Sequence, residues 1–309
     1  MLASHGVAMR SENSALIDPK TTERHSTMVP NSPACPYCQS STVEFLHLQH
    51  TTVYRCDNRN CRLQFASPQP DDCALSEAYD HLYYPIPGNH KAVWEPSPEY
   101  TIEQLLKALA RKSISPDGKR ILDFGCGKGP LLRVLAKFGA EAVGIEQSAT
   151  ARESIHREGF ASAHASLDDL RRERPDAFFD LIFMIDVVEH LRCPWRDLMR
   201  IGQFLAPHGR LVITTMNTNS LRAKLTGANW RERVNPTHLF YFTPDSLANV
   251  LRGTGFGTIA EFTPVTNYSH HGPLRRWLQG FLAICGLQGE LLFVASEFSA
   301  PANLFSAAS

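Results

Sequence analysis

The chain has 309 residues, of which 43% are hydrophobic and 20% are charged, close to the averages of folded soluble proteins. This composition supplies a sizeable apolar core and excludes a chain that is disordered throughout. Thirty-one basic residues balance 31 acidic residues, so the formal net charge is zero. A zero net charge excludes a global basic field that would attract nucleic acid, so a contact with RNA or DNA is unexpected unless it is local.

The first 98 residues divide into three segments of different composition. Residues 1–32 are polar without periodicity, which predicts a disordered tail, and they lack the apolar stretch of a signal peptide. Residues 33–70 contain two pairs of cysteines separated by short apolar runs, as short strands require. Residues 71–98 are rich in proline, aspartate and tyrosine and predict a linker. The sequence contains no run of about 18 apolar residues, so it predicts no membrane-spanning helix, and we expect a cytoplasmic protein.

The clustered cysteines have the spacing of a metal site. Two residues separate Cys35 from Cys38, four separate Cys56 from Cys61, and 17 residues lie between the two pairs. In a long chain without a secretion signal, this cluster predicts metal ligands rather than disulfides. Four thiolates on two turns suit a tetrahedral Zn²⁺, and the segment resembles a zinc ribbon, in which the metal is structural.

Apolar strands alternate with amphipathic helices over residues 99–297. We expect strands at about 120–123, 142–146, 161–165, 180–186, 210–216, 259–264 and 291–295. We expect helices at about 102–109, 131–138, 150–158, 195–205 and from residue 243, with a turn at 207–209. The alternation predicts an α/β fold with a doubly wound, mostly parallel, Rossmann-like sheet. Residues 217–242 are predicted to be an insertion in this domain, and residues 298–309 a tail.

A glycine-rich turn joins the first strand of this domain to its helix. Asp123 precedes the turn, which contains Gly125, Gly127 and Gly129. Such glycines let the backbone approach a ligand, but a carboxylate at Asp123 would repel a pyrophosphate and attract an ammonium group. Glu146 ends the second strand, where an acid can accept both hydroxyls of a ribose. A nucleoside that carries an amino acid instead of phosphates fits both acids, and S-adenosylmethionine is such a molecule.

Taken together, these motifs resemble the small-molecule branch of the class I S-adenosylmethionine-dependent methyltransferases. The resemblance is carried by the turn at 123–129, Glu146, the segments 180–191 and 205–211, and residues 238–244 followed by Gly255 and Phe256. It implies that Asp123, Gly125 and Gly127 bind the methionine part and that Glu146 binds the ribose. It also implies adenine contacts from Gln147, Ser166 and Leu167, and a position for Asp186 beneath the reactive methyl group. Many relatives have an acid where this chain has Ser166.

Methyl transfer from a sulfonium requires alignment of the acceptor, and a base only where the acceptor must lose a proton. His190, after the fourth strand, and His238, in the insertion, are the candidate bases; capping or packing is the alternative role for each. The insertion is interpreted as an acceptor lid, with packing over the sheet edge as the alternative. Residues 273–287 are expected to cover the substrate site as a helix, with weak contact to a membrane surface as the alternative.

These features predict an S-adenosylmethionine-dependent methyltransferase with a structural Zn²⁺. Its expected acceptor is a small polar metabolite, such as a sugar nucleotide or glycan precursor, methylated on oxygen or carbon. One alternative is a methyltransferase of RNA or protein that uses the ribbon for docking. Another is a non-catalytic scaffold that the cofactor stabilises, against which the intact Asp123 and Glu146 argue. The sequence assigns no oligomeric state.

Overall fold

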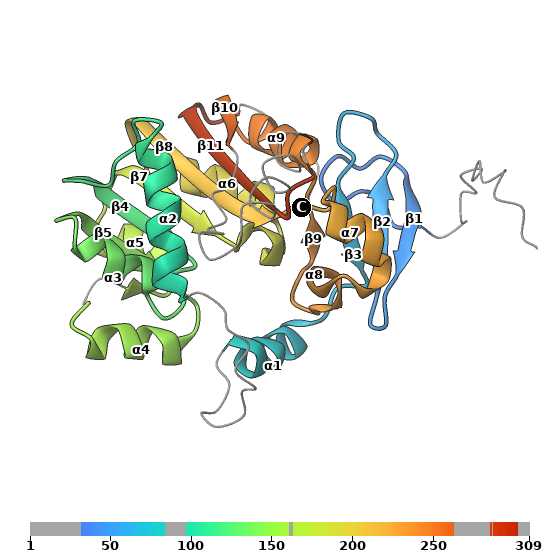
Figure 1. Cartoon of the computed structure of the whole chain (residues 1–309), viewed down its shortest axis with the longest axis horizontal. Coiled ribbons are helices and arrows are strands. Elements are labelled where there is room, and N and C mark those ends of the chain that lie inside the picture. Colours follow the sequence, from blue (N-terminus) through green and yellow to red (C-terminus); the bar gives the residue numbers. More distant parts are fainter. Residues whose placement is uncertain (1–31, 84–96, 161–162, 263–284, 286, 302–309) are drawn as a thin grey trace, which may run out of the picture.

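Two β-sheets organise the chain in a computed structural model that describes residues 32–83, 97–160, 163–262, 285 and 287–301 (Figure 1). One sheet has four strands and the other has seven. The smaller sheet contains the cysteine segment, and the larger one lies within the residues predicted to form the α/β domain. Residues 1–31 and most of residues 273–287, for which the sequence predicted a tail and a covering helix, lie outside the described residues.

The larger sheet has the strand order β10-β11-β8-β7-β4-β5-β6. Its strands are β4 (Arg120–Phe124), β5 (Glu141–Ile145), β6 (Ala163–His164), β7 (Phe179–Ile185), β8 (Leu205–Met216), β10 (Phe256–Phe262) and β11 (Glu290–Phe298). Strands β4 to β8 are parallel, whereas β11 is antiparallel to both of its neighbours, β8 and β10. This doubly wound, mostly parallel sheet confirms the fold class predicted from the sequence.

Helices cover both faces of the larger sheet, so its strands are apolar on both sides. They are α2 (Pro98–Ala110), α3 (Pro130–Ala136), α4 (Ala149–Arg157), α5 (Leu167–Glu173), α6 (Pro194–Gly202) and α9 (Pro244–Gly253). Ile121 packs in the core beneath α2 and α3, whereas its neighbour Leu122 packs in the core beneath α5, α6 and α9. Leu181 and Ile182 of β7 alternate in the same way, as the two-residue period of a strand requires.

Local sequence signals explain where the helices begin. Ser97 caps α2 by accepting a hydrogen bond from the amide of Tyr100, and Pro98 opens the helix. Thr243 and Ser246 form a reciprocal capping box at the start of α9. The predicted helices are therefore present, with ends that differ by a few residues.

Three sequence predictions about local structure need correction. The expected linker 71–98 contains helix α1 (Asp72–Tyr83), because its helix-breaking prolines begin only after this stretch and the side chain of Asp71 caps the amide of Ala74. The expected turn at 207–209 is a bulge within β8, where His208 has a φ of 64°. The expected helix 195–205 ends at Gly202, because Leu205 already belongs to β8 and pairs with Phe179 of β7.

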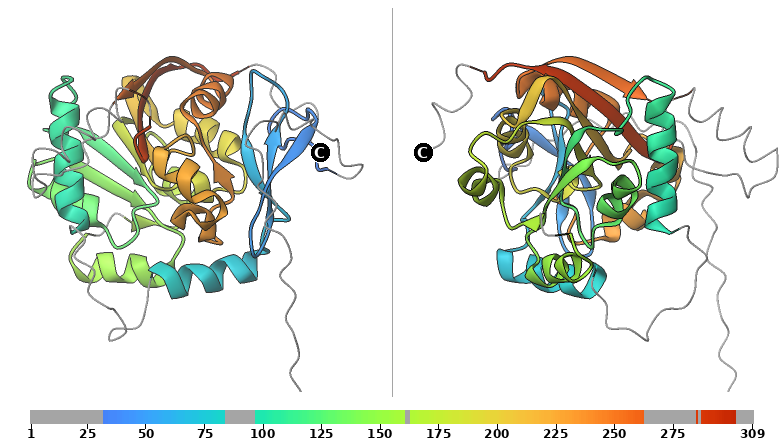
Figure 2. Two further views of the ribbon diagram at one scale, coloured as in Figure 1. Left: turned by 45° about the vertical axis from the view of Figure 1, so that its right-hand side comes forward. Right: turned by 90° about the vertical axis from the view of Figure 1, so that its left-hand side faces the viewer.

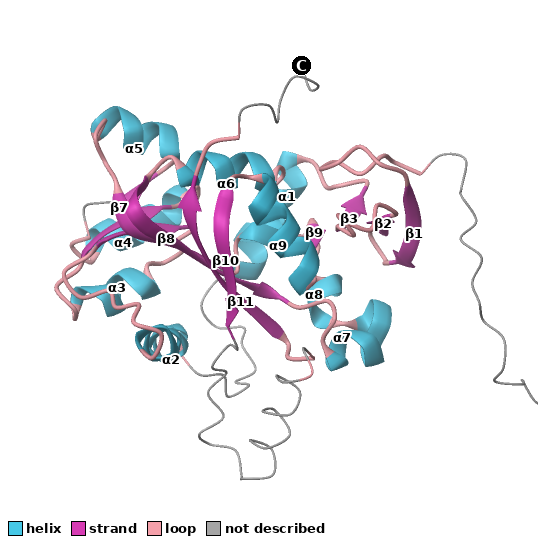
Figure 3. Ribbon diagram, turned by 90° about the horizontal axis from the view of Figure 1, so that it is seen from above, coloured by secondary structure: helices cyan, strands magenta, loops and turns pink. Residues whose placement is uncertain are grey.

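The smaller sheet joins the cysteine segment to the insertion. Its strands β1 (Thr42–His47), β2 (Thr52–Cys56) and β3 (Gln64–Ser67) are consecutive and antiparallel. The fourth strand, β9 (Phe240–Tyr241), comes from the insertion and pairs with β3. Figures 2 and 3 show this sheet at one end of the molecule, and Figure 3 shows β9 on the side of the sheet that faces the larger sheet. The insertion also contributes α7 (Leu221–Thr226), η2 (Gly227–Asn229) and α8 (Arg231–Val234).

Among the described helices, none combines the length and the apolar character that crossing a membrane would require.

Candidate cofactor and acceptor site

The glycine-rich turn has a backbone that other residues adopt only with strain. Gly125, Gly127 and Gly129 have φ angles of 81°, 52° and 77°, in the left-handed region. A Cβ atom on Gly125 would lie 2.4 Å from Cγ2 of Val187, which follows β7. The amide of Gly125 donates to the carbonyl of Ile145 at the end of β5 (2.8 Å). The turn is thereby fixed against the carboxyl ends of β4, β5 and β7.

Glu146 is held between this turn and the start of α4. Its Oε2 accepts a hydrogen bond from the amide of Gly127 at 2.9 Å, and its Oε1 accepts one from the amide of Ser148 at 2.8 Å. Each carboxylate oxygen can accept more than one hydrogen bond, so both oxygens retain capacity for further donors. An oriented acceptor pair of this kind fits the two hydroxyls of a ribose.

Asp123 provides a second acid at the end of β4. Its side chain is 3% exposed, and burial together with the charge of Glu146 raises its pKa to about 8. A cation beside this carboxylate would offset the desolvation and favour the ionised form. The environment therefore fits an ammonium group and disfavours a second anion such as a phosphate.

The residues expected to contact adenine have different surroundings. Gln147 is exposed directly after Glu146. Ser166 caps α5: its Oγ accepts from the amide of Asp169 (3.1 Å) and donates to the Asp169 carboxylate (2.8 Å). Leu167 is buried in the core. The Ser166 hydroxyl proton is engaged by Asp169, so a contact from Ser166 to adenine would use its remaining lone pair and stays a prediction.

Asp186 ends β7 in a strained conformation. Its φ is 52°, and its side chain accepts a hydrogen bond from Oγ1 of Thr214 in β8 at 3.0 Å. Its backbone amide donates to the carbonyl of Thr214 at 3.1 Å. Asp186 is exposed at the sheet edge, but desolvation by the surrounding protein atoms raises the pKa of its carboxyl group. A non-glycine residue held in this region by two bonds to the next strand is typical of a functional position.

The structure brings His190 and His238 together. His190 belongs to η1 (Val188–His190), and its ring centroid lies 4.6 Å from that of His238. Nδ1 of His190 lies 2.9 Å from the carbonyl oxygen of Thr237, and Nδ1 of His238 lies 2.7 Å from that of Glu232. A carbonyl oxygen only accepts, so each Nδ1 carries the proton and each Nε2 carries the lone pair. Burial lowers the pKa of His190 to about 3 and that of His238 to about 4, so both rings are neutral at physiological pH.

The sequence reasoning missed two acids, Glu189 beside His190 and Glu290 near Asp186. Glu189 is 2% exposed, and its Oε2 has no hydrogen-bond partner among the described residues. Glu290 opens β11, and burial together with the charge of Asp186 raises its pKa to about 8. Glu189 had a visible signal, because an acid beside a histidine directly after a buried strand is unusual. Glu290 had none, since β11 lies far along the chain from Asp186.

The insertion is only in part an exposed cover. Phe240, Tyr241 and Phe242 are fully buried in the packing between the two sheets. Trp230 is also buried, and the guanidinium of Arg233 packs over its ring while donating to the carbonyl of Gly227 at 2.9 Å. For these aromatic residues the packing alternative therefore describes the observed contacts. The exposed apolar side chains of the insertion are Leu221, Leu225 and Val234.

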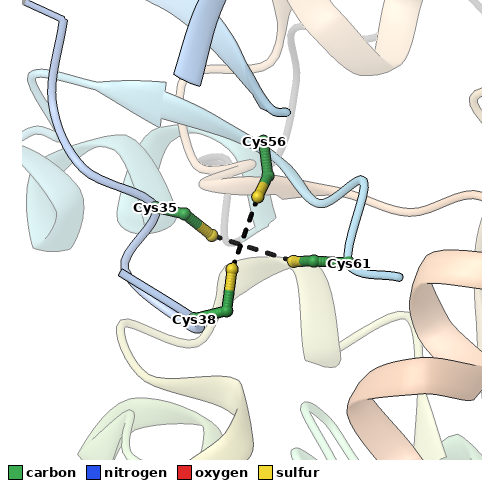
Figure 4. Close-up of side chains that lie close together, drawn as sticks. All are labelled: Cys35, Cys38, Cys56 and Cys61. Atoms are coloured by element: carbon green, nitrogen blue, oxygen red, sulfur yellow. Dashed lines mark hydrogen bonds between the residues drawn. The ribbon is translucent and has the colours of Figure 1, made fainter. Parts of the chain in front are cut away.

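The four clustered cysteines point toward one another from two turns (Figure 4). Sγ of Cys35 lies 3.8 Å from that of Cys61, and Sγ of Cys38 lies 3.4 Å from that of Cys56. Tetrahedral Zn–S bonds of about 2.3 Å place the sulfur atoms about 3.8 Å apart, so the spacing fits a zinc ion. Burial raises the pKa of Cys56 to about 12, and the hydrogen bond with Cys35 together with burial raises the pKa of Cys61, effects that a bound dication would reverse.

Residues 96–261 match a family model described as a methyltransferase domain. The chain belongs to this methyltransferase family. It is a class I S-adenosylmethionine-dependent methyltransferase, as the sheet order and the glycine-rich turn at the ends of β4 and β5 also indicate. The match begins after the cysteine segment, so it says nothing about residues 33–70 of this methyltransferase.

Curated relatives and solved structures agree with this assignment. The methyltransferase is 27% identical over 217 residues to a protein of Cereibacter sphaeroides named ubiquinone biosynthesis O-methyltransferase, covering 64% of this chain and 88% of the relative. It is 30% identical over 219 residues, with the same coverages, to a protein of Roseobacter denitrificans that has the same name. The structure of the [4+2]-cyclase SpnF shares its fold, with a TM-score of 0.50 at 19% identity over 75% of this chain and 99% of that one.

Proposed function

We propose that this methyltransferase transfers the methyl group of S-adenosylmethionine to an oxygen atom of a small polar metabolite. The observation that carries the proposal is the division of the sheet's carboxyl edge into two polar sites. Asp123 and Glu146 lie at the ends of β4 and β5, whereas Asp186, His190 and His238 gather after β7. The O-methyltransferase name of the relatives supports oxygen over carbon as the acceptor atom. A sugar nucleotide or glycan precursor remains the acceptor class predicted from the sequence.

The cofactor site works by charge and by preorganisation. We assign the ammonium group of the cofactor to Asp123 and the ribose hydroxyls to Glu146, whose orientation the amides of Gly127 and Ser148 fix in advance. The sulfonium of S-adenosylmethionine supplies an activated methyl group, so the protein has no leaving group to activate. Its residues have to align the acceptor with that methyl group and exclude water.

Methylation of a hydroxyl requires that the acceptor site allow its proton to be removed. Each ring carries its lone pair on Nε2, as a base must, but Nε2 of His238 already accepts from Nδ2 of Asn235. Burial lowers their pKa to about 3 and about 4, whereas an efficient general base has a pKa near the working pH. An unaided histidine is therefore a weak base here, and the proposed role of both residues is to hold and polarise the acceptor oxygen, with Asp186 beneath the reacting atoms.

We also propose that Cys35, Cys38, Cys56 and Cys61 bind a structural Zn²⁺. The four sulfur atoms lie within 4.8 Å of one another, with no open side for a substrate ligand in a tetrahedral Cys₄ set. The ion would order the turn before β1 and the turn between β2 and β3, and β3 pairs with β9 two residues from His238. The ribbon would thereby support the acceptor site without taking part in the chemistry.

The test is transfer of radiolabelled methyl from S-adenosylmethionine into an extract of cells that lack this protein, followed by separation of small molecules, RNA and protein. We expect label in the small-molecule fraction and an equal amount of S-adenosylhomocysteine. The variant Asp123→Asn should transfer none, whereas Asp117→Asn, on the exposed turn before β4, should match the parent protein. Label confined to RNA or protein would reject the proposal and favour a docking role for the ribbon.

A further inference from the structure

The acceptor site contains a second group of metal-ligating side chains, separate from the cysteines. Glu189, His190 and His238 each place one ligand atom within 4.8 Å of those of the other two. Two come from η1 and one from the insertion, so the group exists only when the insertion folds against the end of β7. The amide of Leu239 donates to the carbonyl of Glu189 at 2.9 Å and fixes this approach.

Both imidazoles are oriented as metal-bound histidines usually are. A metal-bound histidine typically donates its other ring N–H to a carbonyl or carboxylate, which fixes its tautomer and ring orientation. His190 donates from Nδ1 to the carbonyl of Thr237, and His238 donates from Nδ1 to the carbonyl of Glu232. Nε2 of His238 also accepts from Nδ2 of Asn235 at 3.1 Å, a contact that a metal ion would replace.

The surroundings of the Glu189 carboxylate favour a bound cation. Its side chain is 2% exposed, and its Oε2 is buried without a hydrogen-bond partner in the described part of the chain. A buried carboxylate is normally paired with a cation, fully hydrogen-bonded or bound to a metal. The Nδ1 protons of both neighbouring rings are donated to backbone carbonyls and so do not reach this carboxylate, and a second acid, Asp186, lies nearby. An external cation would satisfy this arrangement.

We propose that Glu189, His190 and His238 bind a divalent first-row transition-metal ion, through one carboxylate oxygen and the two Nε2 atoms. Two imidazoles and one carboxylate favour Mn²⁺, Fe²⁺, Co²⁺ or Zn²⁺ over Mg²⁺ and Ca²⁺, which prefer ligand sets made only of oxygen. Three protein ligands leave coordination positions open, as in catalytic rather than structural metal sites. The site therefore differs in ligand type and in purpose from the four cysteines.

The role of this ion rests on the proposed function. An acceptor hydroxyl bound at an open position becomes more acidic and releases its proton to water. An electron pair of that oxygen forms the new C–O bond with the methyl group. The C–S bond of the sulfonium breaks, and its electrons remain on the sulfur of S-adenosylhomocysteine. Because the bound hydroxyl would lose its proton to water, no side chain would have to act as a general base.

The test is titration with CoCl₂ of protein that holds one Zn²⁺ per chain, enough to fill the four-cysteine site alone, followed by visible absorption and by calorimetry. Cobalt on nitrogen and oxygen ligands gives weak d–d bands, whereas cobalt on thiolates also gives intense charge-transfer bands, so the spectrum distinguishes the two sites. We expect one Co²⁺ per chain without thiolate charge transfer. Absence of binding, or a thiolate spectrum alone, would overturn the proposal.

Matched variants assign the ion to its ligands. His238→Asn should weaken Co²⁺ binding by about a hundredfold or more, since even altered support of a ligand costs 10–100-fold. His208→Asn is the control: His208 is exposed near the start of β8, at the end opposite Thr214, and its φ of 64° is one that asparagine tolerates. Equal Co²⁺ affinity in His238→Asn and His208→Asn would overturn the assignment.

A further variant distinguishes the removal of a metal ligand from misfolding as the cause of lost binding. Glu189→Gln keeps the shape of the side chain and removes the buried charge, so without added metal it should melt at the temperature of the parent protein or above. Co²⁺ should raise the melting temperature of the parent protein and leave that of Glu189→Gln unchanged, because only a state that binds the ion is stabilised by it. An equal rise in both proteins would contradict the proposal.

Failure of this inference and failure of the proposed function give different results. Co²⁺ binding is measured without any acceptor, so binding with no methylation of small molecules would support the metal site and reject the function. Methylation of a small molecule at the parent rate by Glu189→Gln, with no Co²⁺ bound by the parent protein, would support the function and overturn the metal site.

Discussion

The two polar sites at the carboxyl edge of the larger sheet are built in different ways. The cofactor side, at β4 and β5, holds Glu146 with the amides of Gly127 and Ser148, all within one β-turn-α-β unit. The acceptor side, after β7, holds His190 through the carbonyl of Thr237, and the adjoining β9 pairs with β3 of the cysteine segment. The first site depends on neighbours in sequence, and the second on three distant parts of the chain.

This difference predicts how each site responds when another part of the chain unfolds. A site stabilised by local backbone hydrogen bonds should survive disruption elsewhere, whereas a site assembled from distant segments should be lost when any one of them unfolds. The cysteine segment then supports methyl transfer through β3 and β9 rather than through contact with the cofactor. Four variants test whether the two sites are independent, and they follow in decreasing order of expected effect.

Loss of one proposed zinc ligand should give the largest difference between the two sides, because methyl transfer should fall while cofactor binding persists. We expect Cys56→Ala to lower methyl transfer by about a hundredfold or more while the affinity for S-adenosylmethionine stays within about threefold, because a small ribbon folds only around its metal. Cys73→Ala, at an exposed thiol outside the cluster, is the matched control. Calorimetric titration with the cofactor and a methyl-transfer assay measure the two effects. An equal loss of affinity for S-adenosylmethionine would show that the cofactor side also depends on the cysteine segment.

The cofactor side should show its own dependence of stability on pH. Asp123 ionises at about 8 in the folded, cofactor-free protein and near 3.9 when unfolded, so between these values the folded state holds the extra proton. Stability should therefore fall as the pH rises from about 4 to 8, by at most about 1.4 kcal/mol per pH unit from this group, and level off above 8. Asp186, Glu189 and Glu290 have raised pKa values and act in the same direction.

The variant Asp123→Asn isolates this contribution. Urea unfolding at several pH values should show a shallower decline than in the parent protein, and at pH 8 the cofactor-free variant should be the more stable of the two. Its binding of S-adenosylmethionine should be lost, because the ammonium group has no carboxylate partner. An unchanged pH profile would show that the buried Asp123 is not the titrating group.

The contact between the two sides can be tested at Gly125. Gly125→Ala places a methyl group where Cγ2 of Val187 already lies, whereas Gly139→Ala has a similar positive φ and no atom within 4 Å of its Cβ. Both variants should lose about 1–2 kcal/mol from the backbone, and Gly125→Ala should lose about 1–3 kcal/mol more from overpacking. Urea denaturation measures the difference, and Val187→Ala should rescue Gly125→Ala but not Gly139→Ala. Equal losses in the two glycine variants would exclude the steric contact.

The smallest expected effect concerns the ribose contact. Glu146→Gln should weaken binding of S-adenosylmethionine by about 10–100-fold, since hydrogen bonds to a charged group contribute about 1.5–3 kcal/mol. The control is Glu141→Gln at the opposite end of the same strand, where the exposed side chain pairs with Arg174. Its cofactor affinity should equal that of the parent protein. Comparable weakening in both variants would place the ribose elsewhere.

The same difference explains which features the sequence could predict. Asp123, the glycines and Glu146 follow strands with strong apolar runs, so their positions at one sheet edge follow from the order of elements. The larger sheet was predictable for the same reason. The bulge at His208 was not, because it depends on the register between β7 and β8 rather than on the local sequence.

The acceptor side was only partly predictable. His190 and His238 could be named separately, but their proximity depends on a hydrogen bond from the Leu239 amide to Glu189 that no sequence pattern indicates. Phe240 and Tyr241 belong to the insertion that was interpreted as an acceptor lid, with packing as the alternative, and they are buried because β9 completes the smaller sheet. A strand of two residues is too short to show a period, so this pairing had no signal.

Hydrogen exchange tests most directly whether the ribbon supports the acceptor side alone. The measurement compares the zinc-loaded protein with Cys56→Ala in peptides covering residues 237–242 and 125–129, which contain the amides of Leu239 and Gly127. We predict that exchange at 237–242 becomes faster by about tenfold or more, because local opening exposes these amides, while exchange at 125–129 is unchanged. Exchange that becomes equally faster in both peptides, or that is unchanged in both, would contradict the claim that the ribbon supports the acceptor side alone.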